Sequence, residues 1–358
     1  MDSNQVIQLI CNIIASRMNN RVKNALYSVV LVLLIFGVWK YRQSKAINEM
    51  KIEGKTMGTT YHITYYDKGA RDFKSKIDSV LLVFNQSLST YIKDSEVTSF
   101  NNGNSFQFNL PYFLPVLRKS FEVETSSGGA FDPTVMPLVN AWGFGPGKKL
   151  KPDSAKIDSI MEFVGFEKVQ FNKDSVWKED VRVQLDFSAI AKGYGVDVVA
   201  NYLKSKGITD WFVEIGGEIS AFGKNRNLDQ AWEAGILDPA STYEHQIFKA
   251  YAQLENRAMA TSGNYFNFYV ENGKKYSHTI DPATGYTIQH ELLSASVFAK
   301  DCMTADAWAT AFMVMGKDEA IKKLSQSGEL DGFLIYSTEN GIETFVTEGI
   351  KPMIKINP

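Results

Sequence analysis

Cysteine is scarce in this chain: its 358 residues include only Cys11 and Cys302, and neither lies in a pattern with zinc-binding or redox spacing. Long runs of Lys and Arg are also missing, and the formal net charge is −2. Proteins that follow a nucleic-acid backbone carry a basic surface, so we expect no nucleic-acid partner. The chain has no internal repeat and no low-complexity stretch, and 44% of its residues are hydrophobic, which excludes fibrous and disordered classes.

Two familiar nucleotide-binding motifs are absent as well. The P-loop pattern GxxxxGK[ST] does not occur, because the nearest stretch, around Lys224, lacks both the spacing and the hydroxyl residue. The stretch WGFGPG at residues 142–147 lacks the third glycine of a dinucleotide fingerprint and follows an expected helix. The sequence therefore offers no motif for a P-loop enzyme or for dinucleotide binding of the Rossmann type.

Only one long apolar run occurs, at residues 25–41, near the lower end of the roughly 17–25 residues that a membrane-spanning helix needs. Basic residues lie on both sides of it, so the positive-inside rule does not fix the orientation. A cleaved signal peptide is the alternative, but the charged stretch WKYRQSKA at its end is a poor cleavage region. We expect an uncleaved transmembrane anchor at residues 25–41, preceded by a tail at residues 1–24 and followed by a domain at residues 51–358.

The remainder of the chain mixes helical and strand patterns. We expect strands at residues 59–66 and 211–215, a meander of strands at 168–185 and several strands across 219–300. Helices are expected at residues 73–84, after Pro111, at 134–142, after Asp153, at 190–206 and at 304–315, followed by a βαβ-like tail. Because these elements do not alternate as regular βαβ units, the pattern predicts the α+β fold class.

Asp306 and Thr310 lie four residues apart within the expected helix at 304–315, so they share one helix face. A carboxylate and a hydroxyl one turn apart offer two hard oxygen ligands, which suit Mg²⁺ or Ca²⁺ better than zinc. The alternative is an acidic residue stabilised near a helix N-terminus beside a packed threonine.

Three glycine-containing stretches could approach a phosphate or a nucleotide. LDFSAIAKGYGVD (residues 185–197) places Asp186 and Lys192 at a change from strand to helix, and SSGGAFDPTVMPL (126–138) and VEIGGEI (213–219) each contain paired glycines. A lysine near a helix start can meet a phosphate, and paired glycines allow close backbone approach to a ligand. Capped helices and ordinary turns would explain the same residues.

His278 lies in YSHTIDPATGY (residues 276–286), three residues before an Asp-Pro turn. A histidine there can act as a general base, or it can simply pack the turn. The residues alone leave both interpretations open.

The order of these stretches along the chain resembles the FAD:protein FMN transferase family, long called ApbE. The matching stretches are MGTTYHITY (57–65), LSTYIKDSEVTSFN (88–101), GGAFDPTVMPLVNAWGF (128–144), LDFSAIAKGYGVD, VEIGGEI, ATSGNY (260–265), HTIDPATG (278–285) and TADAWATAFMVMG (304–316). They cover the chain from about residue 51 to the C-terminus. The resemblance implies a T-fold-like domain with FAD in a cleft between two lobes.

The resemblance also implies a role for individual residues. The residues expected to contact FAD are Met57, Tyr91, Ala130, Phe131, Asp132, Asp186, Lys192 and Ile280. Asp306, Thr310 and the main-chain carbonyl of Ala189 would hold Mg²⁺, and His278 would assist proton transfer.

The implied reaction moves FMN from FAD onto a Ser or Thr hydroxyl of an acceptor flavoprotein and releases AMP. The implied acceptors are subunits of membrane redox complexes, such as the sodium-translocating NADH:quinone reductase and its relatives, or other exported flavoproteins. Such acceptors place the protein at the bacterial cytoplasmic membrane with its catalytic domain on the extracytoplasmic side. Two alternatives use the same residues: an FAD pyrophosphatase, in which water replaces the acceptor, and a non-catalytic flavin-binding protein.

Overall fold

The computed structural model describes residues 19–45, 47–146, 152–242, 244–264, 268–271 and 274–357. Cys11, most of the expected tail at residues 1–24, and Tyr265 of the ATSGNY stretch lie outside these residues. The chain separates into two compact units, one of Met1–Glu49 with Asp67–Arg71 and the other of Met50–Tyr66 with Asp72–Pro358.

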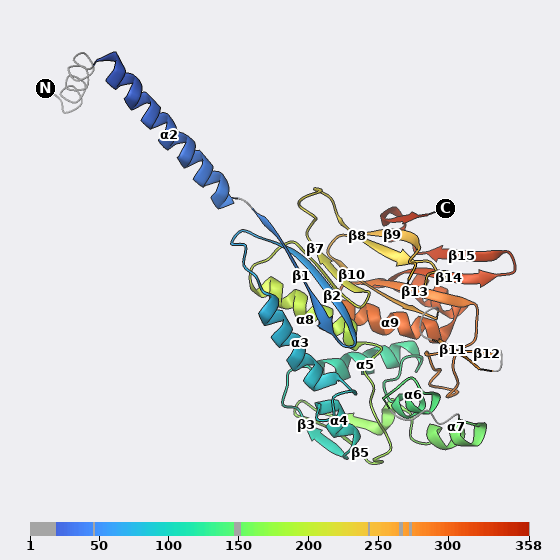
Figure 1. The fold of residues 1–358 in the computed structure, drawn as a ribbon. Coiled ribbons are helices and arrows are strands. Elements are labelled where there is room, and N and C mark those ends of the chain that lie inside the picture. Colours follow the sequence, from blue (N-terminus) through green and yellow to red (C-terminus); the bar gives the residue numbers. More distant parts are fainter. Residues whose placement is uncertain are drawn as a thin grey trace. The chain divides into compact units, whose positions relative to one another are not determined.

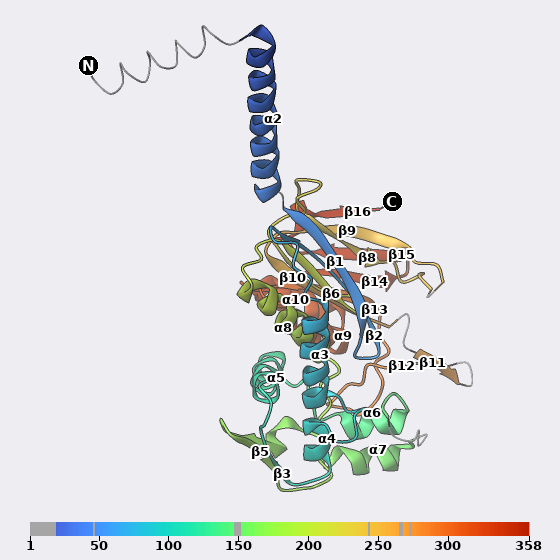
Figure 2. The same cartoon turned by 60° about the vertical axis from the view of Figure 1, so that its left-hand side comes forward.

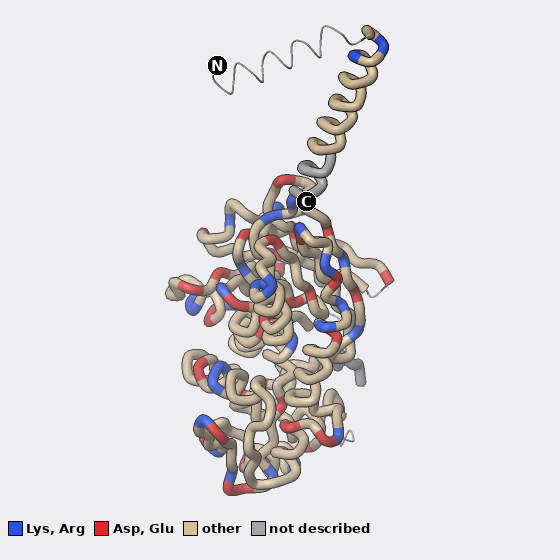
Figure 3. The backbone as a smooth tube through the Cα atoms, turned by 90° about the vertical axis from the view of Figure 1, so that its left-hand side faces the viewer, with Lys and Arg blue, Asp and Glu red and all other residues tan. Residues whose placement is uncertain are grey.

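The first unit contains helix α2, Asn20–Lys45, which includes the apolar run at residues 25–41. Its segment Asn20–Val38 has a mean hydropathy of 1.7 and is 0% buried. In Figure 3 the described part of this helix is blue only near its N-terminal end, where Arg21 and Lys23 lie. One apolar, exposed helix near the N-terminus is the pattern of a membrane anchor or of a signal sequence, rather than of a core helix.

The second unit is built around an eight-stranded sheet with the order β1-β2-β6-β7-β10-β13-β14-β15 (Figure 1). The strands are β1 (Asn48–Thr56), β2 (Thr59–Asp67), β6 (Trp211–Ile215), β7 (Glu218–Phe222), β10 (Arg257–Gly263), β13 (Leu292–Ala299), β14 (Asp331–Thr338) and β15 (Gly341–Val346). Strands β2 and β6 match the predicted segments at 59–66 and 211–215. Their β-branched and aromatic residues fit a pleated surface, and alternate positions such as Tyr61, Ile63 and Tyr65 are buried.

The βαβ-like tail predicted from the sequence is wrong. Every pairing from β2 across to β15 is antiparallel, and β14 and β15 form a hairpin at the edge of this sheet. The local sequence pattern of a helix followed by two apolar strands is the same whether the strands are parallel or antiparallel. The direction is decided by β13, which pairs with β14 through the register Ala295↔Leu334.

Two helices cover the middle of the sheet. Helix α8 (Ala191–Ser205) packs against β6 and β7, α9 (Cys302–Met315) packs against β10 and β13, and the two helices pack against each other. Helix α3 (Lys74–Leu88) packs on α8, α5 (Phe113–Ser127) on α9, and α10 (Lys317–Gln326) on β14 (Figure 2). On α8, Val196, Val199 and Leu203 recur at helical spacing and are fully buried, which explains why this segment forms a helix against the sheet.

Smaller elements complete the unit. The short helices are α4 (Glu96–Asn101), α6 (Met136–Trp142), α7 (Ser154–Met161), η1 (Phe166–Lys168) and η2 (Lys351–Met353). Three further sheets have the orders β16-β9-β8 (Ile354–Ile356, Phe248–Leu254, Trp232–Leu237), β3-β5-β4 (Ser105–Gln107, Ser175–Lys178, Val169–Phe171) and β11-β12 (Phe268–Glu271, Lys274–Ser277). The expected meander at 168–185 therefore ends at Lys178, and the next residues run without a strand to α8.

Helix starts and ends follow local side-chain chemistry. Asp301 caps α9 by accepting the Thr304 N–H at 2.8 Å, so this helix begins two residues before the predicted start at Thr304. Asp153 caps α7 as predicted, by accepting the Lys156 N–H at 2.8 Å. Gly128 ends α5 in the left-handed conformation, with φ 66°, so the role of this glycine is to terminate the helix.

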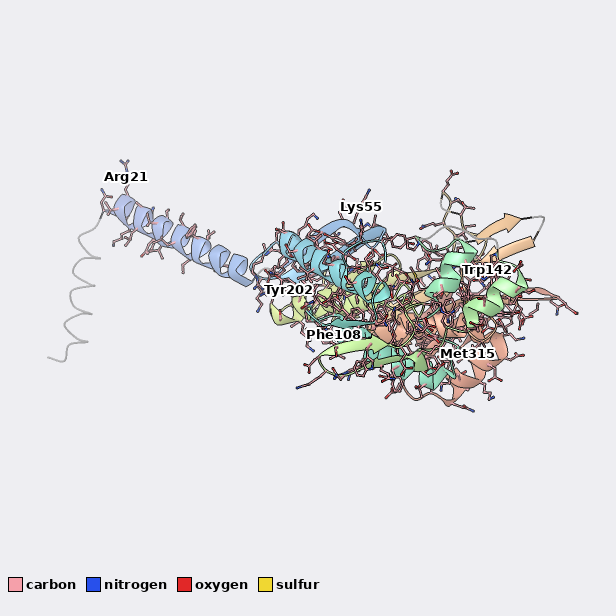
Figure 4. All side chains as sticks on the ribbon, turned by 90° about the horizontal axis from the view of Figure 1, so that it is seen from below. Arg21, Lys55, Phe108, Trp142, Tyr202 and Met315 are labelled. Carbon is pink, nitrogen blue, oxygen red and sulfur yellow. The ribbon has the colours of Figure 1, made fainter. Side chains whose placement is uncertain are left out.

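Trp142 of α6, labelled in Figure 4, connects this helix to the loop that follows His278. Its indole N–H donates to the Gly285 carbonyl oxygen at 2.9 Å. Leu138, Trp142, Ile157 and Ile280 belong to one buried cluster between α6, α7 and this loop. The cluster therefore holds in place the segment that carries two predicted site residues, His278 and Ile280.

Candidate active site

A cavity of about 770 Å³ lies in the second unit, and it brings together nearly all of the predicted site residues. Those that line it are Tyr91, Ala130, Phe131, Asp132, Asp186, Ala189, Lys192, His278, Ile280, Asp306 and Thr310. They come from segments that are distant in the sequence, so only the tertiary fold places them on one cavity. A space of several hundred Å³ is typical of a small-molecule site, and the many charged and hydroxyl residues on this one suit a polar ligand.

Met57 is the predicted residue that does not line this cavity. It lies in the turn between β1 and β2 with φ 50°, and it packs among the partly buried apolar side chains next to the core. A β-carbon added at Gly195 of α8 would lie 2.4 Å from the Met57 methyl carbon, so Met57 packs closely on that helix. Its predicted contact with FAD stays a prediction.

One wall of the cavity holds a charged cluster of Lys192, Glu218 and Asp306, in which both carboxylates are buried and Lys192 is half-buried. Lys192 Nζ donates to Glu218 Oε1 at 2.5 Å, and the side chain of Glu218 is only 2% exposed. Burial lowers the pKa of Lys192, but the nearby carboxylates of Glu218 and Asp306 outweigh it and raise that pKa above its usual value. Lys192 is therefore a cation that faces the cavity.

Glu218 reaches this position because of the turn that precedes it. Gly216 and Gly217 adopt φ 62° and φ 104° between β6 and β7, which residues with a β-carbon rarely adopt. Burial raises the pKa of Glu218 to about 8, and the charge on Lys192 opposes that rise without cancelling it. The paired glycines stand out in the sequence, but Glu218 is not among the predicted site residues, although a carboxylate directly after a glycine turn was a usable signal.

Asp306 is held at the start of α9, beside the start of α8. It is 6% exposed, and one of its oxygens accepts the Gly193 N–H at 2.8 Å. Burial raises the pKa of Asp306, and Lys192 and the Gly193 N–H oppose that rise. Thr310 and Ala189 line the same cavity, so three kinds of oxygen donor are available there: a carboxylate, a hydroxyl and a main-chain carbonyl.

Two further carboxylates lie on the cavity wall. Asp186 accepts the Ser188 N–H at 2.8 Å and its hydroxyl at 2.5 Å, and burial raises the pKa of Asp186. Burial likewise raises the pKa of Asp132 to about 6, although the N–H and hydroxyl of Thr134 both donate to it at 2.7 Å. Each carboxylate is thereby held in place by hydrogen bonds from the residue two positions later in the chain.

His278 lies in the loop after β12 and is partly buried. Its ring packs edge to face against Phe144, with 6.4 Å between ring centroids, and both residues line the cavity. The cavity is also lined by hydroxyl residues that are not among the predicted site residues, namely Ser188, Thr261, Ser262 and Thr279. Single hydroxyl residues carry no sequence pattern, so no local signal would have selected them.

Comparisons with known proteins match this chain over most of its length. Residues 57–334 match the ApbE family. The chain is 38% identical to the FAD:protein FMN transferase of Haemophilus influenzae, covering 86% of this chain and 92% of the relative, and 35% identical to that of Vibrio cholerae, covering 93% and 99%.

Solved structures give the same result at the level of the fold. The flavin transferase ApbE from Vibrio cholerae superposes with a TM-score of 0.78 at 35% identity, covering 86% of this chain and all of that chain (100%). The flavinyl transferase ApbE from Pseudomonas stutzeri, in its apo form, gives 0.76 at 30% identity, covering 86% and 97%. The sequence match and the shared mixed α and β fold together show that this chain belongs to the ApbE family.

Proposed function

We propose that this protein is an FAD:protein FMN transferase, which moves FMN from FAD onto a Ser or Thr hydroxyl of an acceptor protein and releases AMP. The observation that carries this proposal is the cavity in which Lys192, Asp306, Thr310 and His278 meet. The names of the relatives support it, since they are FAD:protein FMN transferases at up to 38% identity.

FAD is the substrate that we place in the cavity. The residues proposed to contact it are Met57, Tyr91, Ala130, Phe131, Asp132, Asp186, Lys192 and Ile280. The cavity volume of about 770 Å³ lies in the upper part of the range of roughly 300–1,000 Å³ that is usual for small-molecule pockets. Lys192 supplies a fixed positive charge for the pyrophosphate, and FAD would occupy a cleft between lobes in a T-fold-like domain.

The donor set fits Mg²⁺. Asp306, Thr310 and the Ala189 carbonyl line one cavity and offer hard oxygen ligands. Among the residues that the structure describes, no group of three or more His, Cys, Asp or Glu side chains gathers as a metal cluster, so a nitrogen- or sulfur-rich site is not formed there. Mg²⁺ at this position would neutralise negative charge on the phosphates during transfer.

The protein's own residues account for the remaining steps. Phosphoryl transfer depends on holding the attacking and leaving oxygens in line and on stabilising charge. Lys192 binds and orients the pyrophosphate, and His278 receives the proton from the acceptor hydroxyl, whose pKa is too high for it to ionise freely. Phe144 packs against the His278 ring and limits its orientations.

The proposal also covers the acceptor protein and the cellular location. The proposed acceptors are exported flavoproteins or subunits of membrane redox complexes, such as the sodium-translocating NADH:quinone reductase or its relatives. The apolar helix Asn20–Val38 would serve as an uncleaved anchor in the bacterial cytoplasmic membrane. Residues 51–358 would then act on the extracytoplasmic side.

Intact-mass analysis tests the proposal directly. The family resemblance implies that acceptors carry the modified residue in a short Ser/Thr-Gly-Ala-Ser/Thr-like motif. A purified acceptor with this motif is incubated with this protein, FAD and Mg²⁺, and it should gain the mass of one FMN. Release of FMN and AMP with no change in the acceptor would show an FAD pyrophosphatase instead. Binding of FAD without either product would show a flavin-binding protein.

A further inference from the structure

Strand β8 lies at one edge of the three-stranded sheet β16-β9-β8, and two of its residues, Gly235 and Leu237, line the cavity. On one side β8 pairs with β9. On its other side, which we call the open edge of β8, no main-chain hydrogen bond joins Trp232–Leu237 to another part of the chain that the structure describes. The wall of the cavity therefore includes this open edge.

The hydrogen bonds of this sheet show which main-chain groups face the open edge. The Asn357 N–H donates to the Lys249 carbonyl oxygen at 2.8 Å, so this carbonyl points towards the β16 side. The C=O and N–H of one trans peptide unit point in opposite directions, and the Ala250 N–H therefore points to β8. Ala250 pairs with Ile236, which directs the Ile236 carbonyl to β9 and the Leu237 N–H to the open edge.

The carbonyl of Leu237 faces the same way. The Asp238 N–H, which belongs to the same peptide unit, donates to the Ile247 carbonyl oxygen at 2.8 Å on the side of β9. Main-chain groups alternate in direction along a strand, so those of Gly235 also face the open edge. The open edge thus presents N–H donors and C=O acceptors from two cavity-lining residues, Gly235 and Leu237.

The proposed reaction requires a protein chain to enter this cavity. A Ser or Thr oxygen is only two bonds from its Cα atom, so the main chain of the acceptor must come close whenever its hydroxyl reaches the phosphates of FAD. Main-chain N–H and C=O groups that leave water cost free energy unless they find hydrogen-bond partners. The open edge of β8 offers such partners on the wall of the same cavity.

The composition of β8 permits another strand to pair with it. Exposed strand edges are commonly protected against pairing by Pro, by Lys or by a covering segment. The sequence of β8, WEAGIL, contains neither Pro nor Lys, and its one charged residue is Glu233. An edge without these protective residues, next to a binding cavity, is typical of sites where an extended peptide adds a strand to a sheet.

We propose that the acceptor protein binds with the segment around its Ser or Thr in an extended conformation, as an added strand on the open edge of β8. This inference rests on the proposed function and states how the protein substrate is recognised. Main-chain hydrogen bonds to Gly235 and Leu237 hold the segment, so that its hydroxyl residue is directed into the cavity. Recognition of this kind depends on an extended main chain more than on large side chains.

Leu237→Pro is the decisive variant, and Leu237→Ala is its matched control. Proline removes the N–H that faces the open edge and leaves the pairing of β8 with β9 in place, and edge strands tolerate proline at such a position. Alanine shortens the same side chain and keeps the N–H. FAD affinity is measured by flavin fluorescence, and FMN transfer is measured at saturating FAD over a range of acceptor concentrations.

We expect the KM for the acceptor to be roughly 3- to 10-fold higher in Leu237→Pro than in Leu237→Ala, as for loss of one hydrogen bond between neutral groups. FAD affinity and kcat should agree between the two variants within about twofold, because the lost contact binds the acceptor equally before and during transfer. This division between KM and kcat would not arise from a general loss of folded protein.

Hydrogen exchange of the wild type gives a second measurement if the proline variant does not fold. An acceptor in which alanine replaces the modified Ser or Thr can bind but cannot react. In its presence the main-chain amides of Gly235 and Leu237 should exchange more slowly, because they become hydrogen-bonded. Strand β15, an edge of the eight-stranded sheet that does not line the cavity, is the control and should show no change.

Three outcomes would overturn the inference. An equal KM for the acceptor in the two variants, or unchanged exchange at Gly235 and Leu237, would show that no strand pairs with the open edge. A lower FAD affinity in Leu237→Pro with an unchanged KM for the acceptor would show that this edge binds FAD instead. Failure of the wild type to transfer FMN would contradict the proposed function itself, so the two failures are distinguishable.

Discussion

Gly193 and Asp306 join the starts of α8 and α9 through one hydrogen bond, from the Gly193 N–H to the carboxylate at 2.8 Å. The helices approach so closely here that a β-carbon on Gly193 would lie 2.2 Å from the Cys302 carbonyl oxygen and 2.7 Å from the Asp306 β-carbon. Glycine at this position therefore sets where the proposed metal ligand lies.

Gly193→Ala should destabilise the protein and displace Asp306. Alanine favours a helix by about 1 kcal/mol over glycine, but overpacking costs roughly 1–3 kcal/mol, and the obstacle is main chain that cannot rotate away. We expect a lower midpoint in denaturant unfolding and reduced FMN transfer. Gly328→Ala, where a β-carbon meets open space, is the control and should change neither. Wild-type stability of the Gly193 variant would show that the two helices can separate without cost.

Asp306→Asn tests the proposed metal site better than Asp306→Ala. Asparagine can still accept the Gly193 N–H, whereas alanine leaves that N–H unpaired at a cost of roughly 1–3 kcal/mol. The loss of charge should abolish transfer at limiting Mg²⁺, and Thr310→Ala should act in the same direction more mildly, because a neutral hydroxyl binds Mg²⁺ less strongly. The measurement is the transfer rate against Mg²⁺ concentration. If the transfer rate of Asp306→Asn depends on Mg²⁺ concentration as the wild-type rate does, Asp306 is not a Mg²⁺ ligand.

His278→Ala separates chemistry from binding. A base acts in the transition state, so FAD affinity should stay within a few fold while the single-turnover rate falls by about 10²–10⁴. If His278 only packs against Phe144, the variant should lose thermal stability and FAD affinity together, and saturating FAD should restore the rate. His245→Ala, at an exposed loop position, is the control. Normal FAD binding with a normal rate would rule out the base role.

Asp197 should make stability depend on pH. Burial raises its pKa to about 7, although the N–H groups of Cys302 and Met303 donate to it at 2.9 and 2.8 Å. A carboxyl group whose pKa is higher in the folded state than in the unfolded state stabilises the folded protein while it is protonated. Its contribution to the free energy of unfolding is complete below the unfolded pKa of about 4 and is lost as the pH rises to the folded pKa of about 7. The unfolding free energy of wild type minus that of Asp197→Asn should therefore fall between pH 4 and 7 and level off above. A difference in unfolding free energy that does not change between pH 4 and 7 would contradict this prediction.

The location can be tested in spheroplasts. The apolar helix α2 and the exported class of acceptor lead us to expect the domain at residues 51–358 outside the cytoplasm. Protease added to intact spheroplasts should digest this domain, while a cytoplasmic marker protein survives. Protection of the domain until the membrane is permeabilised would reverse the orientation. A mature protein that begins after residue 46 would show a cleaved signal peptide.

The sequence by itself determined the family and the local elements. Family membership is confirmed by the comparisons, because ordered motifs spread over residues 57–334 do not depend on knowing the fold. Strand β6 and helix α7 follow from β-branched runs and from the cap at Asp153, which are interactions between near neighbours in the chain. Asp306 and Thr310 were placed on one helix face by spacing alone, and both line the cavity.

Only the tertiary structure decided the features that depend on contacts between residues far apart in the chain. The antiparallel direction of β14 is fixed by β13 beyond two intervening helices, so the local pattern could not distinguish it from a βαβ unit. Met57 packs beside Gly195 because helix α8 lies against the turn between β1 and β2, and these elements are distant in the sequence. Glu218 pairs with Lys192 only because helix α8 packs against β7 in the folded protein. Burial and pairing of this kind arise from long-range packing, which no spacing of residues along the sequence records.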